Sequence, residues 1–204
     1  MSEPISAMVL AGGKSRRLGV DKAYLALNNG RSLVASAVAA VRAVSADVMV
    51  VAGPDFCPEC FDARLVIDVY PGKGSLGGIY SGLLRSEYSH CLVVACDMPF
   101  LNVDLLAHMV SLDRDYDVLI PRADDKLEPL HAIYSKGCLP HMRDLLSRDH
   151  LRIIEFFDKV RVKYVEAAEI EVFDPHHLSF FNVNTPEQLA AARALIESGF
   201  QPER

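Results

Sequence analysis

The sequence lacks any apolar run that approaches the roughly 20 residues needed to cross a bilayer as a helix. Its start, Met1 to Pro4, has no basic region, and Gly12 and Gly13 soon interrupt the apolar residues that follow. We therefore expect no signal peptide, no membrane partner and a cytoplasmic location. The chain also has no internal repeat, low-complexity tract or linker. Its 204 residues predict a single domain, 1–204.

The sequence also lacks an excess of positive charge, with a net charge of −6 at pH 7. Because nucleic-acid binding usually requires a basic face, we expect no nucleic-acid partner. The cations near the N-terminus are a local concentration in an acidic protein. They indicate a small anionic ligand.

Cysteines are few, and of the five only Cys57 and Cys60 are closely spaced. One CxxC without a second pair or matching histidines predicts a surface loop with reduced thiols rather than a zinc site. Cys91 and Cys96 lie in an apolar run and are expected in the core. No Ser-His-Asp or Cys-His arrangement for nucleophilic catalysis is evident.

Short apolar runs alternate with amphipathic segments, which predicts an α/β fold: a single-domain, doubly wound, mostly parallel sheet. We expect strands at residues 5–10, 48–52, 65–69, 91–96, 118–121, 130–134, 161–165 and 180–183. Helices are expected at residues 33–44, 76–86, 103–112, 139–146, 152–160 and 186–198, the last starting at Thr185-Pro186-Glu187.

The N-terminal stretch Leu10–Lys22 joins the first expected strand to a loop rich in glycine and cations. Glycine lets a backbone approach a ligand closely, and Lys and Arg neutralise phosphate oxygens. A P-loop is excluded, because the first glycine of that pattern would fall at Met8, inside the strand. The stretch still predicts a phosphate-binding turn.

Two further polar clusters follow expected strands, where open α/β sheets bind ligands. Asp68 precedes the glycine-rich stretch 70–78, and Asp97 directly follows the fourth strand. A carboxylate at such a place can hold Mg²⁺ together with substrate phosphates. As an N-cap for the helix near Val103, Asn102 is better placed than Asp97.

Other features leave alternatives open. Gly72–Gly77 matches GxGxxG before a helix, as in a nicotinamide-dependent oxidoreductase, but it follows the third strand and not the first. Asn182 and Asn184 share one face of an extended segment, where they would either present amides to a second substrate or form a turn. Glu128–His131 is a candidate substrate-side loop that the sequence alone does not decide.

Several of these residues together resemble a known family. The opening stretch is similar to L-A-G-G-x-S-x-R-M-G-x-D-K of doubly wound nucleotidyltransferases, with Leu18 in place of Met. Gly74–Gly78 resembles G-P-L-x-G, Cys96–Pro99 resembles C-D-x-P, and 181–186 resembles F-x-N-x-N-T-P. The combination is similar to molybdenum cofactor guanylyltransferases over nearly the whole chain. Two departures are Val51-Ala52-Gly53, where some members have Asn, and Ser75 in place of Pro.

The resemblance implies transfer of GMP from GTP to molybdopterin, with Mg²⁺ as cofactor. It implies a nucleotide-binding half at about 1–121 and an acceptor-binding half at about 122–204. Assembly proteins of the molybdenum cofactor and apo-molybdoenzymes are expected partners. The residues that it implies for GTP binding are Leu10, Ala11, Gly12, Gly13, Lys22, Asp68 and Asp97. It implies Arg17, Lys22 and Asp97 as catalytic residues, with Asp97 as the metal ligand. For molybdopterin binding it implies Asn182 and Asn184.

Three rivals remain beside this interpretation: the nicotinamide-dependent oxidoreductase, a non-catalytic GTP-binding partner of cofactor assembly, and a related transferase with another nucleotide or acceptor. A phosphate monoester is already a competent nucleophile, so nucleotidyl transfer needs charge neutralisation and alignment more than an activated side chain. Of the cations, Arg17 and Lys22 occupy signature positions, whereas Lys14 and Arg16 occupy variable ones.

Overall fold

The computed structural model describes residues 3–12, 22–27, 30–56, 62–123 and 125–199. Its core is one sheet in the order β3-β2-β1-β4-β7-β5-β6, with β8 paired to β5. The strands are β1 (Ser6–Leu10), β2 (Asp47–Ala52), β3 (Arg64–Ile67), β4 (His90–Ala95), β5 (Val118–Ala123), β6 (Lys126–Leu127), β7 (His131–Ser135) and β8 (Val162–Glu166). The helices are α1 (Leu33–Arg42), α2 (Gly74–Arg85), α3 (Val103–Ser111), α4 (Leu139–Ser147), α5 (Ala167–Ile170) and α6 (Pro186–Glu197).

The sheet is mostly parallel, as the sequence predicts. β1 pairs in parallel with β2 and β4, β2 with β3, and β5 with β8. β7 runs antiparallel between β4 and β5, and β6 is antiparallel to β5. Because β7 reverses direction, its first residue lies beside the carboxyl end of β4, with His131 opposite Val94. The loop before β7 therefore reaches the edge where the parallel strands end.

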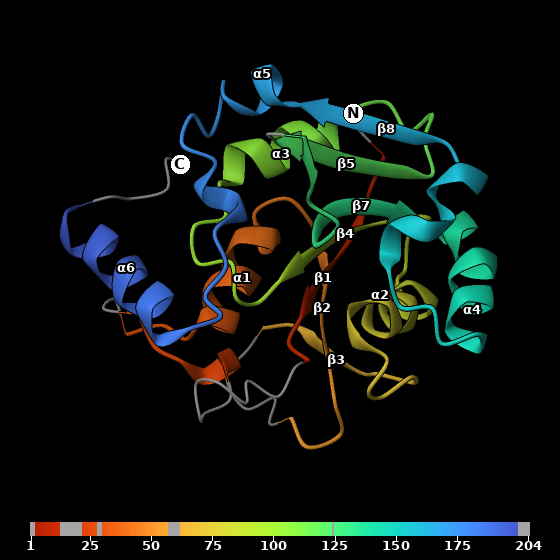
Figure 1. Cartoon of the computed structure of the whole chain (residues 1–204), viewed down its shortest axis with the longest axis horizontal. Helices are drawn as coiled ribbons and strands as arrows, with labels where there is room; N and C mark the ends of the chain where they lie inside the picture. The colour runs from red at the N-terminus through yellow and green to blue at the C-terminus, as the bar shows by residue number, and fades with distance from the viewer. Residues whose placement is uncertain (1–2, 13–21, 28–29, 57–61, 124, 200–204) are drawn as a thin grey trace.

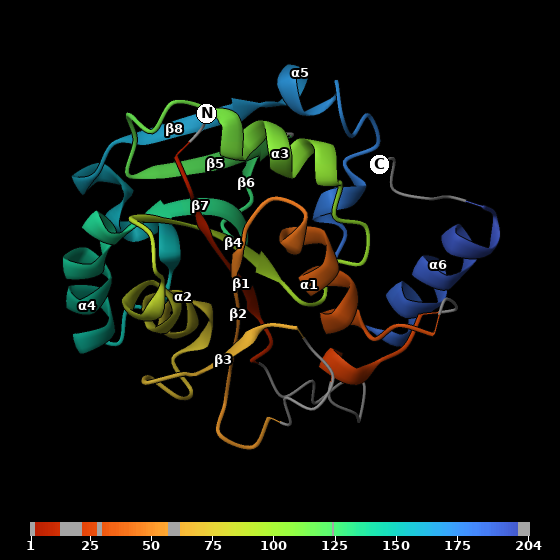
Figure 2. The same cartoon turned by 180° about the vertical axis from the view of Figure 1, so that it is seen from behind.

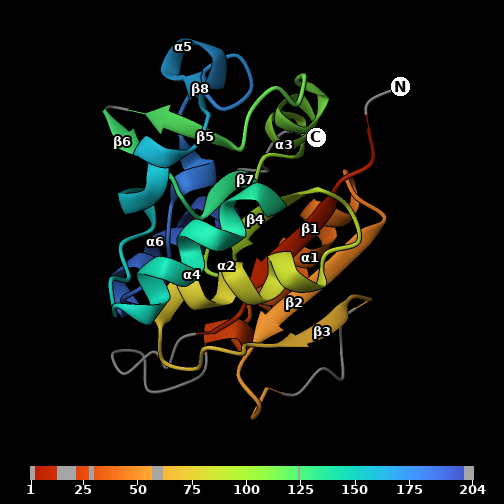
Figure 3. The same cartoon turned by 90° about the vertical axis from the view of Figure 1, so that its right-hand side faces the viewer.

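Helices cover both faces of the sheet, with α2 and α4 side by side on one face and α1 and α3 on the other (Figures 1 and 3). Successive side chains of the central strands alternate between the two cores. Val9 packs on the α1 and α3 side, and its neighbour Met8 packs on the α2 and α4 side. The continuous apolar runs seen in the sequence arise because both faces are buried.

Glycines bring α2 unusually close to the sheet. A Cβ at Gly82 would overlap Sδ of Met8, and one at Gly78 would lie 3.2 Å from Cδ2 of Leu10. Any larger side chain at Gly82 would need the buried Met8 to move. The close approach fixes the start of α2 against the carboxyl ends of β1 and β2.

The helix expected at residues 152–160 is confirmed, and it is the 3₁₀ helix Ile153–Lys159. It buries Ile153 and Phe156, which eclipse at a spacing of three. One expected element is wrong in type. The strand expected at 180–183 is replaced by the 3₁₀ helix Leu178–Phe180 and an irregular segment. There the buried Asp174 carboxylate accepts the backbone N–H groups of Leu178 and Ser179, at 3.0 and 2.7 Å. These bonds hold the chain in a turn.

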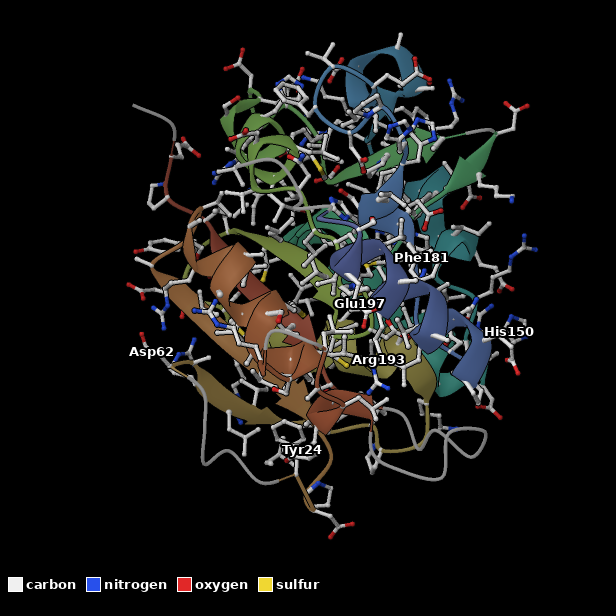
Figure 4. The ribbon with its side chains drawn as sticks, turned by 90° about the vertical axis from the view of Figure 1, so that its left-hand side faces the viewer. Tyr24, Asp62, His150, Phe181, Arg193 and Glu197 are labelled. Carbon is white, nitrogen blue, oxygen red and sulfur yellow. The ribbon has the colours of Figure 1, made fainter. Side chains whose placement is uncertain are left out.

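α6 starts as the sequence predicts, at a capping box between Thr185 and Gln188 with Pro186 in the first turn. It packs against a small core that includes Leu33 at the start of α1, so that α1 lies between the sheet and α6 (Figure 2). Arg193 donates from Nη2 to the carbonyl oxygen of Ala26 at 3.2 Å (Figure 4). Among the residues that the structure describes, none belongs to a helix with the length and hydropathy of a membrane span.

Candidate active site

Backbone hydrogen bonds join the ends of the first four strands. The Ala11 amide donates to the Val51 carbonyl at 2.9 Å, and the Cys96 amide donates to the Leu10 carbonyl at 3.0 Å. On the outer side, the Asp68 amide donates to Ala52 at 2.9 Å. The three polar loops that the sequence places after separate strands therefore start from one edge of the sheet, as expected for a ligand site in an open α/β fold.

The opening loop enters this edge through Gly12. Leu10 and Ala11 are 7% and 8% exposed, whereas Gly12 is exposed, and a Cβ built on it would meet nothing within 4 Å. Among the described residues of this loop, Gly12 is thus the one whose backbone a ligand can approach. Gly13 and Arg17 lie outside the described residues, so their predicted roles stay predictions.

Lys22 begins a 3₁₀ helix, Lys22–Tyr24, that is held at the same edge. Ala23 is buried in the core, and the Tyr24 ring stacks on Phe56, which follows β2, with centroids 5.5 Å apart. These contacts place the Lys22 backbone near the ends of β1 and β2. Its proposed contact with phosphates stays a prediction.

Asp68 is held in a fixed orientation after β3. Its Oδ1 accepts from the Tyr70 amide at 2.9 Å and from the Ser81 hydroxyl of α2 at 2.7 Å. Ser81 Oγ also accepts the Val69 amide at 3.0 Å. The sequence singled out Asp68 but missed Ser81, because a partner 13 residues away on a helix leaves no local pattern.

The glycine-rich stretch after Asp68 is a turn followed by α2. Gly72 and Gly74 have φ of +83° and +62°, which only glycine adopts readily. Gly77 lies within α2, where a Cβ would meet the Tyr70 carbonyl oxygen at 3.0 Å. The glycines of the GxGxxG pattern therefore shape this turn and the packing of α2.

Asp97 lies in the turn directly after β4 and is half-buried. Asn102, and not Asp97, caps α3, with its side-chain oxygen accepting the Leu105 amide at 2.8 Å, as the sequence predicts. Within the described ranges no group of three or more His, Cys, Asp and Glu side chains could hold a metal ion. A single carboxylate is nevertheless a sufficient protein contribution for Mg²⁺, which keeps water and substrate phosphates as its other ligands.

The segment Asn182–Asn184 reaches the Asp97 turn from the far end of the chain. The Val183 amide donates to the Asp97 carbonyl oxygen at 2.9 Å. Val183 is fully buried, whereas Asn182 and Asn184 on either side are half-exposed, as expected of alternate residues in an extended segment. The structure thus brings together the proposed metal-binding and acceptor-binding residues, which are 85 and more positions apart in sequence.

A cavity of about 580 Å³ lies beside this edge. Its lining comes from three places: Ser75 at the start of α2, residues 125–129 at the β5–β6 hairpin and the loop after it, and residues 151–154. The loop is joined to the site because the Ala95 amide of β4 donates to the Leu130 carbonyl at 3.1 Å. The sequence left the role of Glu128–His131 open and missed Arg152, whose position at this cavity has no local signal.

Two groups near the edge, one half-buried and one fully buried, have shifted pKa values. Burial raises the pKa of Glu128, which lines the cavity, and nearby Lys126 offsets this in part. His131 is fully buried, and neither ring nitrogen has a hydrogen-bond partner among the described residues. Burial lowers the pKa of His131 to about 4, so its ring is neutral at pH 7.

The buried thiols are core residues rather than nucleophiles. Cys91, Cys96 and Cys138 are buried, which confirms the expectation for the first two. Burial raises the pKa of Cys138 to about 12 and that of Cys91 well above its ordinary value. Cys57 and Cys60 lie outside the described residues. The thiols of Cys91 and Cys138 are therefore not activated.

A mostly parallel sheet with glycine-rich and acidic loops at its carboxyl edge defines a nucleotide-binding α/β protein of the nucleotidyltransferase class. The sequence profile of the MobA-like NTP transferase domain matches residues 7–161. The chain belongs to this family, and within it to the molybdenum cofactor guanylyltransferases. This assignment sets aside the nicotinamide alternative.

Relatives are similar over almost their full length. A probable molybdenum cofactor guanylyltransferase of Pelotomaculum thermopropionicum is 38% identical over 194 residues, covering 95% of this chain and 94% of the relative. The molybdenum cofactor guanylyltransferase of Desulfosudis oleivorans is 31% identical, with 97% and 98% covered. The crystal structure of molybdopterin-guanine dinucleotide biosynthesis protein A from Archaeoglobus fulgidus superposes with a TM-score of 0.83 at 27% identity, covering 95% of this chain and all of that one.

Proposed function

We propose that this protein transfers GMP from GTP to molybdopterin, forming a guanine dinucleotide cofactor and releasing pyrophosphate. The observation that carries the proposal is the hydrogen bond from Val183 to Asp97, which joins the segment of the two asparagines to the carboxylate turn. Two substrates that react with each other must meet at one place. This bond brings together two segments, the Asp97 turn and residues 182–184, from the two halves of the sequence.

The nucleotide binds, in this proposal, along the opening loop and the ends of β1–β3. The Leu10 carbonyl and the Ala11 amide already hydrogen-bond to neighbouring strands, so Gly12 and the residues after it supply the backbone contacts to GTP. Asp68, which Ser81 and the Tyr70 amide hold in place, lies on the nucleoside side. Lys22 and Arg17 neutralise the phosphates, where a Lys or Arg forms charge-assisted hydrogen bonds.

The reaction needs no enzyme nucleophile. A terminal phosphate oxygen of molybdopterin forms a bond to the α-phosphorus of GTP, and the bond from that phosphorus to the oxygen bridging the α- and β-phosphates breaks. The electron pair leaves with pyrophosphate. The enzyme's task is to hold two anions in line and to stabilise the leaving charge, which positioning and fixed cations accomplish.

Magnesium belongs to the same proposal. Asp97 would hold it, since a half-buried carboxylate at the sheet edge is open to water and phosphate oxygens. When bound, the ion supplies Lewis-acid stabilisation of the phosphoryl oxygens. The Asp97 turn itself is kept in place by its backbone bond to Val183, independently of the carboxylate.

The acceptor half is proposed to comprise about residues 122–204, which provide Asn182, Asn184 and most of the cavity lining. The two halves differ in their proposed function and are not separate folding units, because β5 crosses the boundary between residues 121 and 122. A cytoplasmic location, which the use of GTP favours, is part of the proposal. So are assembly proteins that deliver molybdopterin and apo-molybdoenzymes that receive the product.

Thermal stabilisation by GTP, CTP and ATP, each with Mg²⁺, tests the nucleotide. A nucleotide at about 100 times its Kd stabilises the native state by about 2.7 kcal/mol, which is easily measured. GTP is expected to raise the melting temperature and CTP to raise it much less. Equal stabilisation by CTP would favour the related transferases. GTP binding without pyrophosphate release in the presence of molybdopterin would favour a non-catalytic binding protein.

A further inference from the structure

The cavity beside the site is held open by contacts that do not involve a ligand. Lys73, just before α2, bonds through Nζ to Oδ1 of Asp149 at 2.8 Å, which ties the wall at Ser75 to the wall at 151–154. The Tyr134 hydroxyl donates to the Pro129 carbonyl at 2.8 Å, and the Glu128 amide donates to the Pro121 carbonyl at 3.1 Å. A preformed cavity of about 580 Å³ has the size of a small-molecule site.

The lining has the chemistry for a flat heteroaromatic ring with hydrogen-bond donors. The apolar residues of the lining include Leu127, Pro129, Leu151 and Ile153, and its polar residues include Glu128 and Arg152. A half-buried carboxylate can bind two N–H groups on one edge of a ring, and such charge-assisted bonds are stronger than neutral ones. Ser75, which replaces the usual proline of the family, also lines the cavity.

The cavity lies within reach of the reacting groups. The loop that carries Glu128 continues to Leu130, whose carbonyl accepts from Ala95, and Asp97 is two residues beyond Ala95. An acceptor whose ring occupies the cavity can therefore extend its phosphate toward the Asp97 turn. Among the described residues, Leu10–Gly12 and Asp68 do not belong to this cavity's lining.

We propose that Glu128 determines acceptor specificity by accepting hydrogen bonds from the 2-amino and N3–H groups of the pterin ring of molybdopterin. The inference rests on the proposed function and adds the residue that recognises the acceptor's ring. A pterin presents two adjacent N–H donors, and a carboxylate presents two acceptors at matching spacing. The apolar walls of the cavity cover the ring faces.

The partial burial of Glu128 makes its carboxylate costly to leave without a hydrogen-bond partner. Burial raises the pKa of Glu128, and Lys126 partly counteracts this shift. Asp125 and Arg152 are the other charged residues of the lining. A partly desolvated carboxylate gains more from two donors than an exposed one does, which favours a ligand with an amino group over one with a carbonyl at that position.

The test uses two fluorescent probes, pterin and lumazine, on the purified protein. Lumazine has a carbonyl in place of the 2-amino group of pterin. At this position it would therefore present a hydrogen-bond acceptor to the Glu128 carboxylate, which is itself an acceptor. We expect the wild-type protein to bind pterin about tenfold or more tightly than lumazine, as the loss of a hydrogen bond to a charged group implies. Glu128→Gln should bring the ratio close to one.

Glu87→Gln is the matched control, since Glu87 is exposed at the opposite edge of the sheet beside the start of β4. It should retain the wild-type preference. In the transfer assay, Glu128→Gln should raise KM for molybdopterin about tenfold with little change in kcat, and GTP stabilisation should be unchanged. Because the ratio of two probes is measured on one protein sample, partial unfolding of the variant does not alter it.

Equal affinity of the wild-type protein for both probes, or an unchanged preference in Glu128→Gln, would overturn the inference. Neither result bears on GTP transfer, which the assay with wild-type protein decides separately. Absence of transfer by wild-type protein would instead overturn the proposed function. The two failures are thus distinguishable.

Discussion

The Val183 amide donates a hydrogen bond to the Asp97 carbonyl oxygen, at 2.9 Å. The bond joins a turn after β4 to a segment that follows the 3₁₀ helix Leu178–Phe180, near the other end of the chain. It uses only backbone atoms, so it survives substitution of the Asp97 side chain. The carboxylate of Asp97 and the amides of Asn182 and Asn184 can therefore be tested one at a time without separating the segments.

Asp97→Asn is expected to abolish Mg²⁺-dependent transfer while leaving the fold intact. The amide keeps the shape of the side chain but removes the negative charge that a hard cation requires. Turnover should fall by about 100-fold or more, equivalent to about 2.7 kcal/mol of transition-state stabilisation. The measurement is initial rate against Mg²⁺ concentration, with the melting temperature as a check on folding. Wild-type turnover in the variant would reject Asp97 as the metal ligand.

Lys22→Ala should reduce kcat by about 100-fold or more if the ammonium group stabilises the leaving phosphates. Lys14→Ala is the matched control, because Lys14 occupies a variable position of the opening signature, and it should stay near wild type. Steady-state kinetics of both variants decide the matter. Activity of Lys22→Ala within about threefold of wild type, under about 0.7 kcal/mol, would exclude that role.

Gly82→Ala should destabilise the protein even though alanine is the better helix former. The new Cβ would overlap Sδ of Met8 and lie 3.1 Å from Cγ2 of Val51. Overpacking of this kind costs about 1–3 kcal/mol and helix propensity returns roughly 1 kcal/mol, so we expect a net loss of about 1 kcal/mol. Urea unfolding measures the net loss. Gly53→Ala, where a Cβ meets nothing within 4 Å, is the control and should change stability by less than about 0.5 kcal/mol.

His131→Phe should make stability less dependent on pH between about 6.5 and 4. Burial lowers the folded-state pKa of His131 to about 4, and the nearby Asp174 charge only partly opposes this. The unfolded chain therefore binds a proton in this range and the folded chain does not, so wild-type stability falls as pH falls. The loss for a group shifted this far is about 3 kcal/mol by pH 4.

Urea unfolding of both proteins at pH 7 and pH 4.5 tests this expectation, because other titrating groups affect both equally. His131→Leu repeats the test without the added volume of phenylalanine. Identical pH dependence in wild type and in both variants would show that the imidazole remains solvated or paired.

The sequence predicted best those features that depend on neighbouring residues. β1, the Asn102 cap and the Thr185 capping box each follow from a pattern within a few positions. The loops after β1, β3 and β4 were placed at one edge because parallel strands end together. The direction of a strand and its partners far away in sequence could not be predicted. The alternation of apolar and polar residues, for example, does not reveal that β7 runs antiparallel.

Features that depend on contacts between residues far apart in sequence could not be predicted from local sequence patterns. The 3₁₀ helix Leu178–Phe180 forms because Asp174 accepts two backbone amides, and no apolar pattern signals such a bond. His108 has no sequence neighbour as partner, yet its Nε2 lies 2.8 Å from Glu169 Oε1. The cavity combines residue 75 with residues near 128 and 152, so the sequence could flag the Glu128 loop but could not decide its role.

Guanylyl transfer itself tests the proposed reaction most directly. Purified protein is incubated with molybdopterin, Mg²⁺ and GTP labelled on the α-phosphate. We expect the label to appear in a guanine dinucleotide of molybdopterin, with one pyrophosphate released for each dinucleotide and little product when CTP replaces GTP. Pyrophosphate release that does not depend on molybdopterin, or no labelled dinucleotide at all, would contradict the proposed reaction.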